Sequence, residues 1–574
     1  MVRGTFFGVE IGKTGLTTAQ FGLDVTGHNI SNLDTAGFTR QRIVSTAHDP
    51  FSTIGKFAPV GQGLVGGGVR VQILDQIRSA YLDRRFRDES TTHAYWDTRA
   101  QSLTYIQSFF DNVNEKTSIN YSMAEFFRSM TIVSQDPVSG APRTLMQTAA
   151  MDLVQQLNMI YEGLIDFQKV EDRAVVTKTG DINRIAQDIR DLNVAIYTFE
   201  ITGMIANDLR DKRNLLFDEL ARYGDMEYRE YPDKFGHSQM EVSFAGGILV
   251  DHDMFNTLGV AWIDNVLPGE DKVAIPYWET WVGPGFDPNN PDMNTLNTVR
   301  IDTKLVGGEL KSHLDMRDGL GGGVDSKNRG VPYYIEMMNN LARALVQEIN
   351  GQHIQGWSDH PVNGSNTNIH FFAINDVTGI PANVGSIVYL DADGVPLVPQ
   401  PTPPVDPDLP KRYELTNAEL QSITARNLTL SQDIQDSAFN IAAASRQIGR
   451  PDFEGTPEEL ARHSNGNMRA LYDLFRKTGI TVAGTDIGSF DDYGTTIRFD
   501  VGNTLHTANQ AAETSRILSL AAKNQRTAVA GVSLDEEMVG LVRYNHAYNG
   551  AARVITAMDD ALDRLINGTG RVGL

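Results

Sequence analysis

The chain has 574 residues, with 50 Lys and Arg against 72 Asp and Glu and a formal net charge of −22. This acidic balance argues against nucleic acid and anionic membrane surfaces as partners, because both bind concentrated positive charge. The chain contains no cysteine, which rules out disulfides, thiolate metal sites and cysteine nucleophiles.

The N-terminal segment carries an apolar heptad repeat. The repeating positions are Val2, Val9, Leu16, Leu23 and Ile30, and a second row of mostly small residues ends at Leu33. Glycines at positions 4, 8 and 12 suit close approach of another helix, but each glycine inside a helix costs about 1 kcal/mol. We therefore predict a helix that is ordered by contact with something else, followed by a turn at 34–38.

The middle of the chain alternates between helical and extended patterns. Residues 41–90 predict short extended pieces, and 91–225 predict helices. Within that helical region, isoleucines at 182, 185 and 189 begin a three-four spacing that is typical of one arm of a coiled-coil hairpin. Residues 226–330 predict β structure, including a hairpin around Gly246-Gly247. A helical stripe follows at 335–349, and seven prolines between Pro396 and Pro410 exclude a regular helix there.

The last helix is predicted from apolar residues at alternating steps of four and three. Its apolar seam is Leu534, Met538, Leu541, Tyr548, Ile555, Leu562 and Ile566. Other apolar residues, such as Val539 and Val542, lie off this seam, which is typical of a helix packed among several others. The acidic first turn at 535–537 is interpreted as complementing the helix dipole. We expect neighbouring copies to complete both ends; docking of the ends on the protein's own middle is the alternative, and periodicity does not decide between them.

These patterns predict an elongated, multidomain α+β fold. A long α-helical coiled-coil core is formed by both termini, 1–40 with 530–574. A mainly helical second domain comprises 41–225 with 331–355 and 420–529, including the short extended part at 41–90. Residues 226–330 form a β-rich inserted domain, and 356–419 form a proline-rich insertion of loops and β structure.

The two ends resemble the paired signatures of bacterial flagellar rod, hook and hook-associated proteins. The resemblance rests on residues 16–32 and 35–42 at one end, and on 531–538 with Leu541, Tyr544, Tyr548 and 551–555 at the other. Within that group, internal motifs resemble the hook-associated protein 1 family, whose members form the first junction between hook and filament. These motifs are Asp136-Pro137, 206–209 with Arg213 and Leu215-Leu216, and 307–310 with 315–318.

The resemblance implies a structural subunit of the extracellular flagellum rather than an enzyme. It implies export in an unfolded state without a cleaved signal peptide, followed by self-assembly of the terminal helices into a tube. Residues 1–30 agree with this, because Glu10 and Lys13 interrupt any signal-peptide core. The implied partners are further copies of the chain in a ring, the hook protein, and the second junction protein with the filament cap or flagellin side. An export chaperone would bind the C-terminal helix at the same apolar seam.

Other candidate sites are weaker. The 8–14 segment lacks the spacing of a phosphate-binding loop, and His353, His360 and His370 lack the spacing of a zinc site, so no cofactor and no metal are expected. Asn207, Asp208 and Arg213 are candidate contacts between subunits, although a hydrogen-bonded, charged helix surface is the favoured alternative. The competing functions are another axial protein of hook or rod, or an axial subunit with a hydrolase inserted in 226–415.

Overall fold

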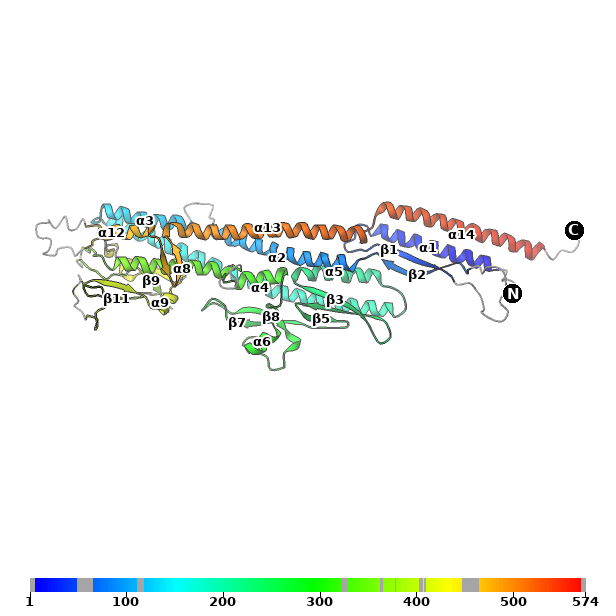
Figure 1. The fold of residues 1–574 in the computed structure, drawn as a ribbon, viewed down its shortest axis with the longest axis horizontal. Coiled ribbons are helices and arrows are strands. Elements are labelled where there is room, and N and C mark those ends of the chain that lie inside the picture. The colour runs from blue at the N-terminus through cyan, green and yellow to red at the C-terminus, as the bar shows by residue number, and fades with distance from the viewer. Residues whose placement is uncertain are drawn as a thin grey trace.

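The computed structural model describes residues 6–48, 66–110, 118–321, 328–361, 365–376, 378–401, 406, 409–445 and 464–568. Val2 of the predicted N-terminal seam lies outside these residues. The protein is elongated and combines long helices with several small antiparallel sheets, which confirms the predicted α+β class (Figure 1). The first and the last described helices lie side by side at one tip of the molecule (Figure 1). No described helix is both long enough and apolar enough to cross a bilayer.

A terminal module occupies that tip. It consists of helices α1 (Phe7–Ser31) and α14 (Leu534–Gly568) and the antiparallel strands β1 (Gln41–Ala47) and β2 (Val69–Gln76), both of which contact α1. The extended stretch expected up to residue 90 ends earlier, because helix α2 begins at Ala80. The buried face of its first turns contains Asp83 and Arg87. Buried polar residues hide the helical period from a search for apolar spacing.

Long helices form a body next to this module. The pair α2 and α13 continues the line of the terminal module, and α4 runs beside it through most of the length (Figure 1). The helical body comprises α2 (Ala80–Phe110), α4 (Gly140–Glu200), α5 (Asn207–Tyr223), α7 (Gly308–Asp318) and α13 (Phe490–Ala530).

Helix α7 lies inside the stretch predicted to be β-rich up to residue 330, so that prediction was wrong at its C-terminal end. The helix is short, and its buried face includes Arg317, which is fully buried and paired with Asp172 and Asp318. A short helix with a buried cation has no clear apolar stripe, which explains why the pattern missed it.

The predicted isoleucine seam is buried, but its partner differs from the one expected. Ile182, Ile185 and Ile189 of α4 belong to one apolar cluster with Phe217 of α5 and Val242 of strand β4 (Ser238–Phe244). A sheet and a short helix therefore cover the seam in place of a second coiled-coil arm. One row of apolar residues fits either kind of partner, so spacing alone does not distinguish them.

The β module projects to one side of the body (Figure 1). The predicted hairpin is confirmed: β4 and β5 pair antiparallel through a turn in which Ala245 and Gly246 both have positive φ, as a tight two-residue turn requires. The module contains β3 (Met226–Pro232), β4 (Ser238–Phe244), β5 (Gly247–Asp251), β6 (Met254–Phe255), β7 (Leu258–Ile263), β8 (Val273–Trp278) and α6 (Met293–Val299).

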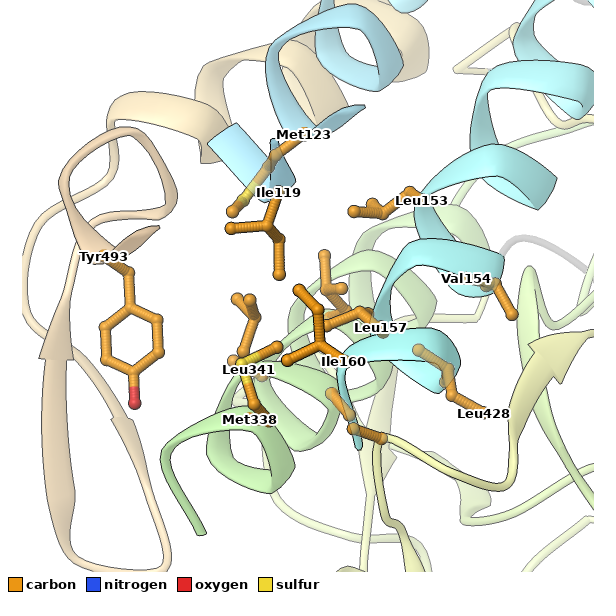
Figure 2. Packing of buried hydrophobic residues seen from close by; sticks show 14 of the residues in the cluster. Ile119, Met123, Leu153, Val154, Leu157, Ile160, Met338, Leu341, Leu428 and Tyr493 are labelled. Carbon is orange, nitrogen blue, oxygen red and sulfur yellow. The ribbon is translucent and has the colours of Figure 1, made fainter. Parts of the chain in front are cut away.

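The end far from the terminal module is a compact core of short elements around α3 and α8. Figure 2 shows Met123, Leu157 and Leu341 from three different helices pointing into it. The predicted stripe Ile335, Met338, Ala342, Leu345 and Ile349 is fully buried. The elements are α3 (Ile119–Gln135), α8 (Val331–His353), α9 (Asn417–Ser422), α10 (Gln432–Asp436), α12 (Gly466–Asp473), β9 (Phe372–Asn375), β10 (Pro381–Ala382), β11 (Ser386–Tyr389), β12 (Lys411–Glu414), β13 (Leu428–Leu430), β14 (Ile480–Val482) and β15 (Thr485–Gly488).

Residues 420–489 were predicted to be mainly helical, and their described part contains only short helices and strands. Side chains of Ser431 and Ser437 cap the starts of two of these short helices. Serine bonds to nearby backbone groups and so favours frequent starts over one long helix. A long helix begins only at Phe490.

The histidine at the end of α8 is a core residue. The Nδ1 atom of His353 lies 2.7 Å from the Ile369 carbonyl oxygen, and the Ala442 N–H donates to Nε2 at 2.9 Å. Both ring nitrogens therefore have backbone partners, and the described residues contain no group of three or more potential ligands arranged for a metal. Burial lowers the pKa of His353 to about 4.

We expect this histidine to make stability depend on pH. The unfolded chain binds the proton near pH 6.5 and the folded chain only near pH 4, so stability is complete above the first value and falls as the pH drops toward the second. The loss amounts to about 3 kcal/mol. Denaturant unfolding at several pH values measures this slope, which His353→Gln should make shallower and the exposed-site control His546→Gln should not. An unchanged slope in His353→Gln would contradict the assignment.

Candidate assembly site

The two terminal helices pack against each other in antiparallel order through glycines. A Cβ atom added to Gly8 would lie 2.6 Å from the Met558 sulfur, and one added to Gly12 would lie 2.7 Å from Ile555 Cγ1. At Gly22 the added atom would lie 2.5 Å from Tyr544 Cδ1. Real Cβ contacts are longer than this, so the glycines form a groove that side chains of α14 fill. The predicted close approach is therefore confirmed, and the approaching helix belongs to the same chain.

Helix α1 buries its row of small residues, and the row of large residues is less buried. Gly12, Ala19 and Thr26 are buried, together with Val25 and Asn29. The larger predicted residues Val9, Leu16, Leu23 and Ile30 are only half-buried, and Leu33 lies beyond the helix end and is exposed. The large row therefore borders the contact with α14 and keeps surface free.

The predicted residues of the C-terminal seam differ in how far they are buried against α1. Leu541, Tyr548, Ile555 and Leu562 are half-buried, as expected for the side facing α1. Leu534, Met538 and Ile566 are exposed, Ile566 at 65%. The alternate positions of the seam are instead taken by Glu537, Tyr544, Ala551 and Met558, which contact α1. These residues also recur every seventh position, and that repeat was the signal available in the sequence.

Most of α14 remains open to solvent. All residues of this helix are described, and Glu537 alone is buried. Its off-seam apolar residues, including Val539 at 70%, are exposed. The alternative in which both ends dock on the middle of the protein is not what is observed, because the ends pair with each other at the tip of the molecule (Figure 1).

Glu537 is a functional candidate that sequence reasoning missed. Its side chain is buried and accepts hydrogen bonds from Asn29 Nδ2 at 3.1 Å and from Arg40 Nε at 2.7 Å. Arg40 also pairs with Glu536. The acidic first turn was interpreted as complementing the helix dipole; the structure adds a specific cation and an amide donor. This carboxylate connects the first turn of α14 to α1 and to the residue that precedes β1.

The polar residues predicted at 207–213 lie next to these contacts, because Asn207 and Asp208 both bond to Gln41, the residue after Arg40. Asn207 is buried and its side-chain amide donates to the Leu74 carbonyl at 3.2 Å. Arg213 is buried and donates to Asn193 Oδ1 at 2.9 Å and Glu230 Oε1 at 3.1 Å. Burial lowers the pKa of its guanidinium to about 10. Both residues thus have partners in their own chain, and they are buried rather than part of a charged helix surface.

Asp208 differs from its two neighbours in exposure. It accepts from Gln41 Nε2 at 2.8 Å and lies 3.3 Å from His28 Nε2, yet 60% of its side chain is exposed. A contact between Asp208 and a neighbouring subunit stays a prediction.

Two protein families match separate parts of this chain, one the central region and the other the C-terminal region. Residues 103–372 match the family described as "Flagellar hook-associated protein FlgK helical domain", and residues 524–568 match "Flagellar basal body rod FlgEFG protein C-terminal". The first match runs from α2 to β9, and the second covers the end of α13 and all of α14.

Whole-chain relatives agree with these matches. "Flagellar hook-associated protein 1" of Bacillus subtilis (strain 168) is 24% identical, with 99% of both chains covered. The protein of the same name from Escherichia coli (strain K12) is also 24% identical, with 96% of this chain and 98% of the relative covered.

A solved structure is similar in fold. It is the flagellar hook junction protein FlgK from Burkholderia pseudomallei, with a TM-score of 0.51 and 12% identity, covering 79% of this chain and 100% of that chain. The resemblance of the terminal and internal motifs is thereby confirmed. The chain is thus similar to flagellar hook-associated protein 1 over almost its whole length, and its central region matches the helical domain of that family, whose members are structural proteins of the flagellum and not enzymes.

Proposed function

We propose that this protein is a subunit of the junction between hook and filament, and that its terminal helices are completed by neighbouring copies after export. The observation that carries this proposal is the exposed apolar surface of α14. A helix of 35 residues that buries one of them gains little hydrophobic free energy from its single partner. Exposed apolar patches of this extent mark interaction surfaces.

A second copy of the same chain is the occupant that fits best. The exposed residues Val539, Val542 and Val554 follow α14 along its length, so a neighbour must also be extended along this direction. The half-buried large row of α1, which includes Leu16 and Leu23, offers an apolar surface of similar length. Packing these rows between subunits would surround each helix pair with others and produce a tube.

Export and partner choice follow from the same surface. Ends that are incomplete in a single subunit are easy to keep unfolded for passage through the flagellar export channel, and the absence of cysteine avoids oxidation outside the cell. A chaperone bound at Leu541, Tyr548 and Ile555 would prevent premature association in the cell. The hook protein on one side, and the second junction protein with the filament on the other, are the proposed neighbours in the extracellular flagellum.

The alternative assignments are less well supported. A hook or rod protein would not need the long helix α4, which lies entirely within the part of the chain that matches the helical-domain family. The structural role of the family also argues against a hydrolase inserted in 226–415.

Deletion of residues 534–566 should abolish incorporation into hooks and leave the body folded. The deletion removes α14 and exposes the α1 groove, while the apolar clusters of the body and β module contain no residue of α14. Co-sedimentation with isolated hooks measures incorporation, and circular dichroism with thermal unfolding measures the fold of the body. Incorporation of the truncated protein at the level of the full chain would refute the proposal.

Gly22→Ala should weaken incorporation, whereas Gly15→Ala should not. The new methyl group at position 22 would collide with the Tyr544 ring, at a cost of about 1–3 kcal/mol, whereas at position 15 it would meet only Ala551 Cβ at 3.5 Å. Because 1.4 kcal/mol corresponds to a factor of ten, the apparent dissociation constant for hooks should rise roughly tenfold in Gly22→Ala. In Gly15→Ala it should stay equal or fall, since alanine favours helix. Equal affinities of the two variants would show that the glycine groove is not used.

A further inference from the structure

The chain passes between the terminal module and the helical body at two places. Residues 77–79 lead from β2 to α2, and residues 531–533 lead from α13 to α14. A third segment, residues 32–40 between α1 and β1, lies at the same boundary. Two short connections without further support would act as a hinge, because hinge motion needs only a few residues to change their backbone angles.

The main chain of Arg40 bonds to both connections. Its N–H donates to the carbonyl of Ala530, the last residue of α13, at 2.9 Å. Its carbonyl accepts from the N–H of Ile77, the first residue after β2, also at 2.9 Å. Its guanidinium reaches Glu536 and Glu537 in the first turn of α14. One residue therefore connects the end of α13, the start of α14 and the exit of the β1–β2 hairpin.

The residues on either side of Arg40 bond across the same boundary. The Thr39 N–H donates to Asp211 Oδ2 of α5 at 2.9 Å, and Asp211 is buried. Gln41 Nε2 donates to Asp208, also on α5, at 2.8 Å. The main chain of Gln41 exchanges two hydrogen bonds with the side chain of Asn29 on α1, at 2.8 and 3.1 Å.

Three polar motifs that the sequence singled out thus meet at one place. They are the segment that includes 39–42, the group at 207–213 and the acidic turn at 535–537. Hydrogen bonds in which one partner is charged are short and directional, and several of them on consecutive residues leave little freedom for rotation. Apolar packing alone, in which side chains slide more easily, does not give this restraint.

We propose that Thr39–Gln41 form a rigid joint that fixes the direction of the terminal helix pair relative to the helical body, with Arg40 as the positioning residue. The inference rests on the proposed function, because a fixed direction matters when identical subunits must close a ring. Loss of the Arg40 side chain would leave α14 attached to α13 through residues 531–533 without the ion pairs from Arg40 to its first turn. The helix pair would then take a range of directions.

The absence of cysteine allows a direct test by spin labelling. Cysteines at Thr17 on α1 and Asn524 on α13, both exposed, place one label on each side of the joint. Labelled subunits are diluted into unlabelled wild-type protein and bound to isolated hooks, and the distance distribution is measured by pulsed electron paramagnetic resonance. Wild-type protein should give one narrow distribution, and Arg40→Gln should give one at least twice as wide.

Two variants serve as controls. Arg42→Gln removes an arginine two positions away, whose partner Asp75 lies on the adjacent strand of the same hairpin; its distribution should match the wild type. Arg40→Lys retains the charge but can engage the two carboxylates less fully, so its width should lie between those of wild type and Arg40→Gln. A distribution for Arg40→Gln as narrow as the wild type would overturn the joint.

The remaining outcomes are also decisive. If Arg40→Gln fails to bind hooks while Arg42→Gln binds, an unchanged thermal transition of the body supports the joint, and an unfolded body overturns it. If wild-type protein itself fails to bind hooks, the proposed function fails, and the joint is tested in the isolated subunit with the same labels. Broadening by Arg40→Gln there supports the joint, and identical widths reject it.

Discussion

The close approach of α1 and α14 is the interaction on which the terminal module depends. Three glycines on α1 receive Met558, Ile555 and Tyr544, and this contact holds together two segments that lie at opposite ends of the sequence. Glycine weakens a lone helix, so the same residues that permit the contact make α1 depend on it. In the terminal module, α1 is therefore a weak helix by itself, and its glycines allow it to pack closely against α14.

Polar contacts connect this module to a body that is stabilised by buried apolar side chains. The body and the distal core bury large apolar clusters, whereas the boundary with the terminal module contains Arg40, Asp211 and Glu537 with their partners. A buried carboxylate that has lost water requires a well-placed donor, and such pairing tolerates few geometries. The division between an apolar body and a polar boundary explains how one chain can combine a stable part with a part of defined direction.

The sequence predicted helices with apolar stripes well and polar interfaces poorly. The stripe of α8 and the β4–β5 hairpin were correct because each has a strong local signal. The start of α2 and the whole of α7 were missed because Asp83 and Arg317 occupy buried positions. The contact between Glu537 and α1 was not predicted, because only the three-dimensional neighbours Asn29 and Arg40 give a buried carboxylate its partners. Partner identity depends on contacts between distant segments, which local spacing does not encode.

The distance along the chain between the two halves of the helix pair affects the order of folding. Asn29 and Glu537 are 508 positions apart, so the ribosome makes the residues that fill the α1 groove long after it has made α1. The first helix is therefore without its partner during the synthesis of everything that lies between them. That interval gives the cell time to keep the two helices apart.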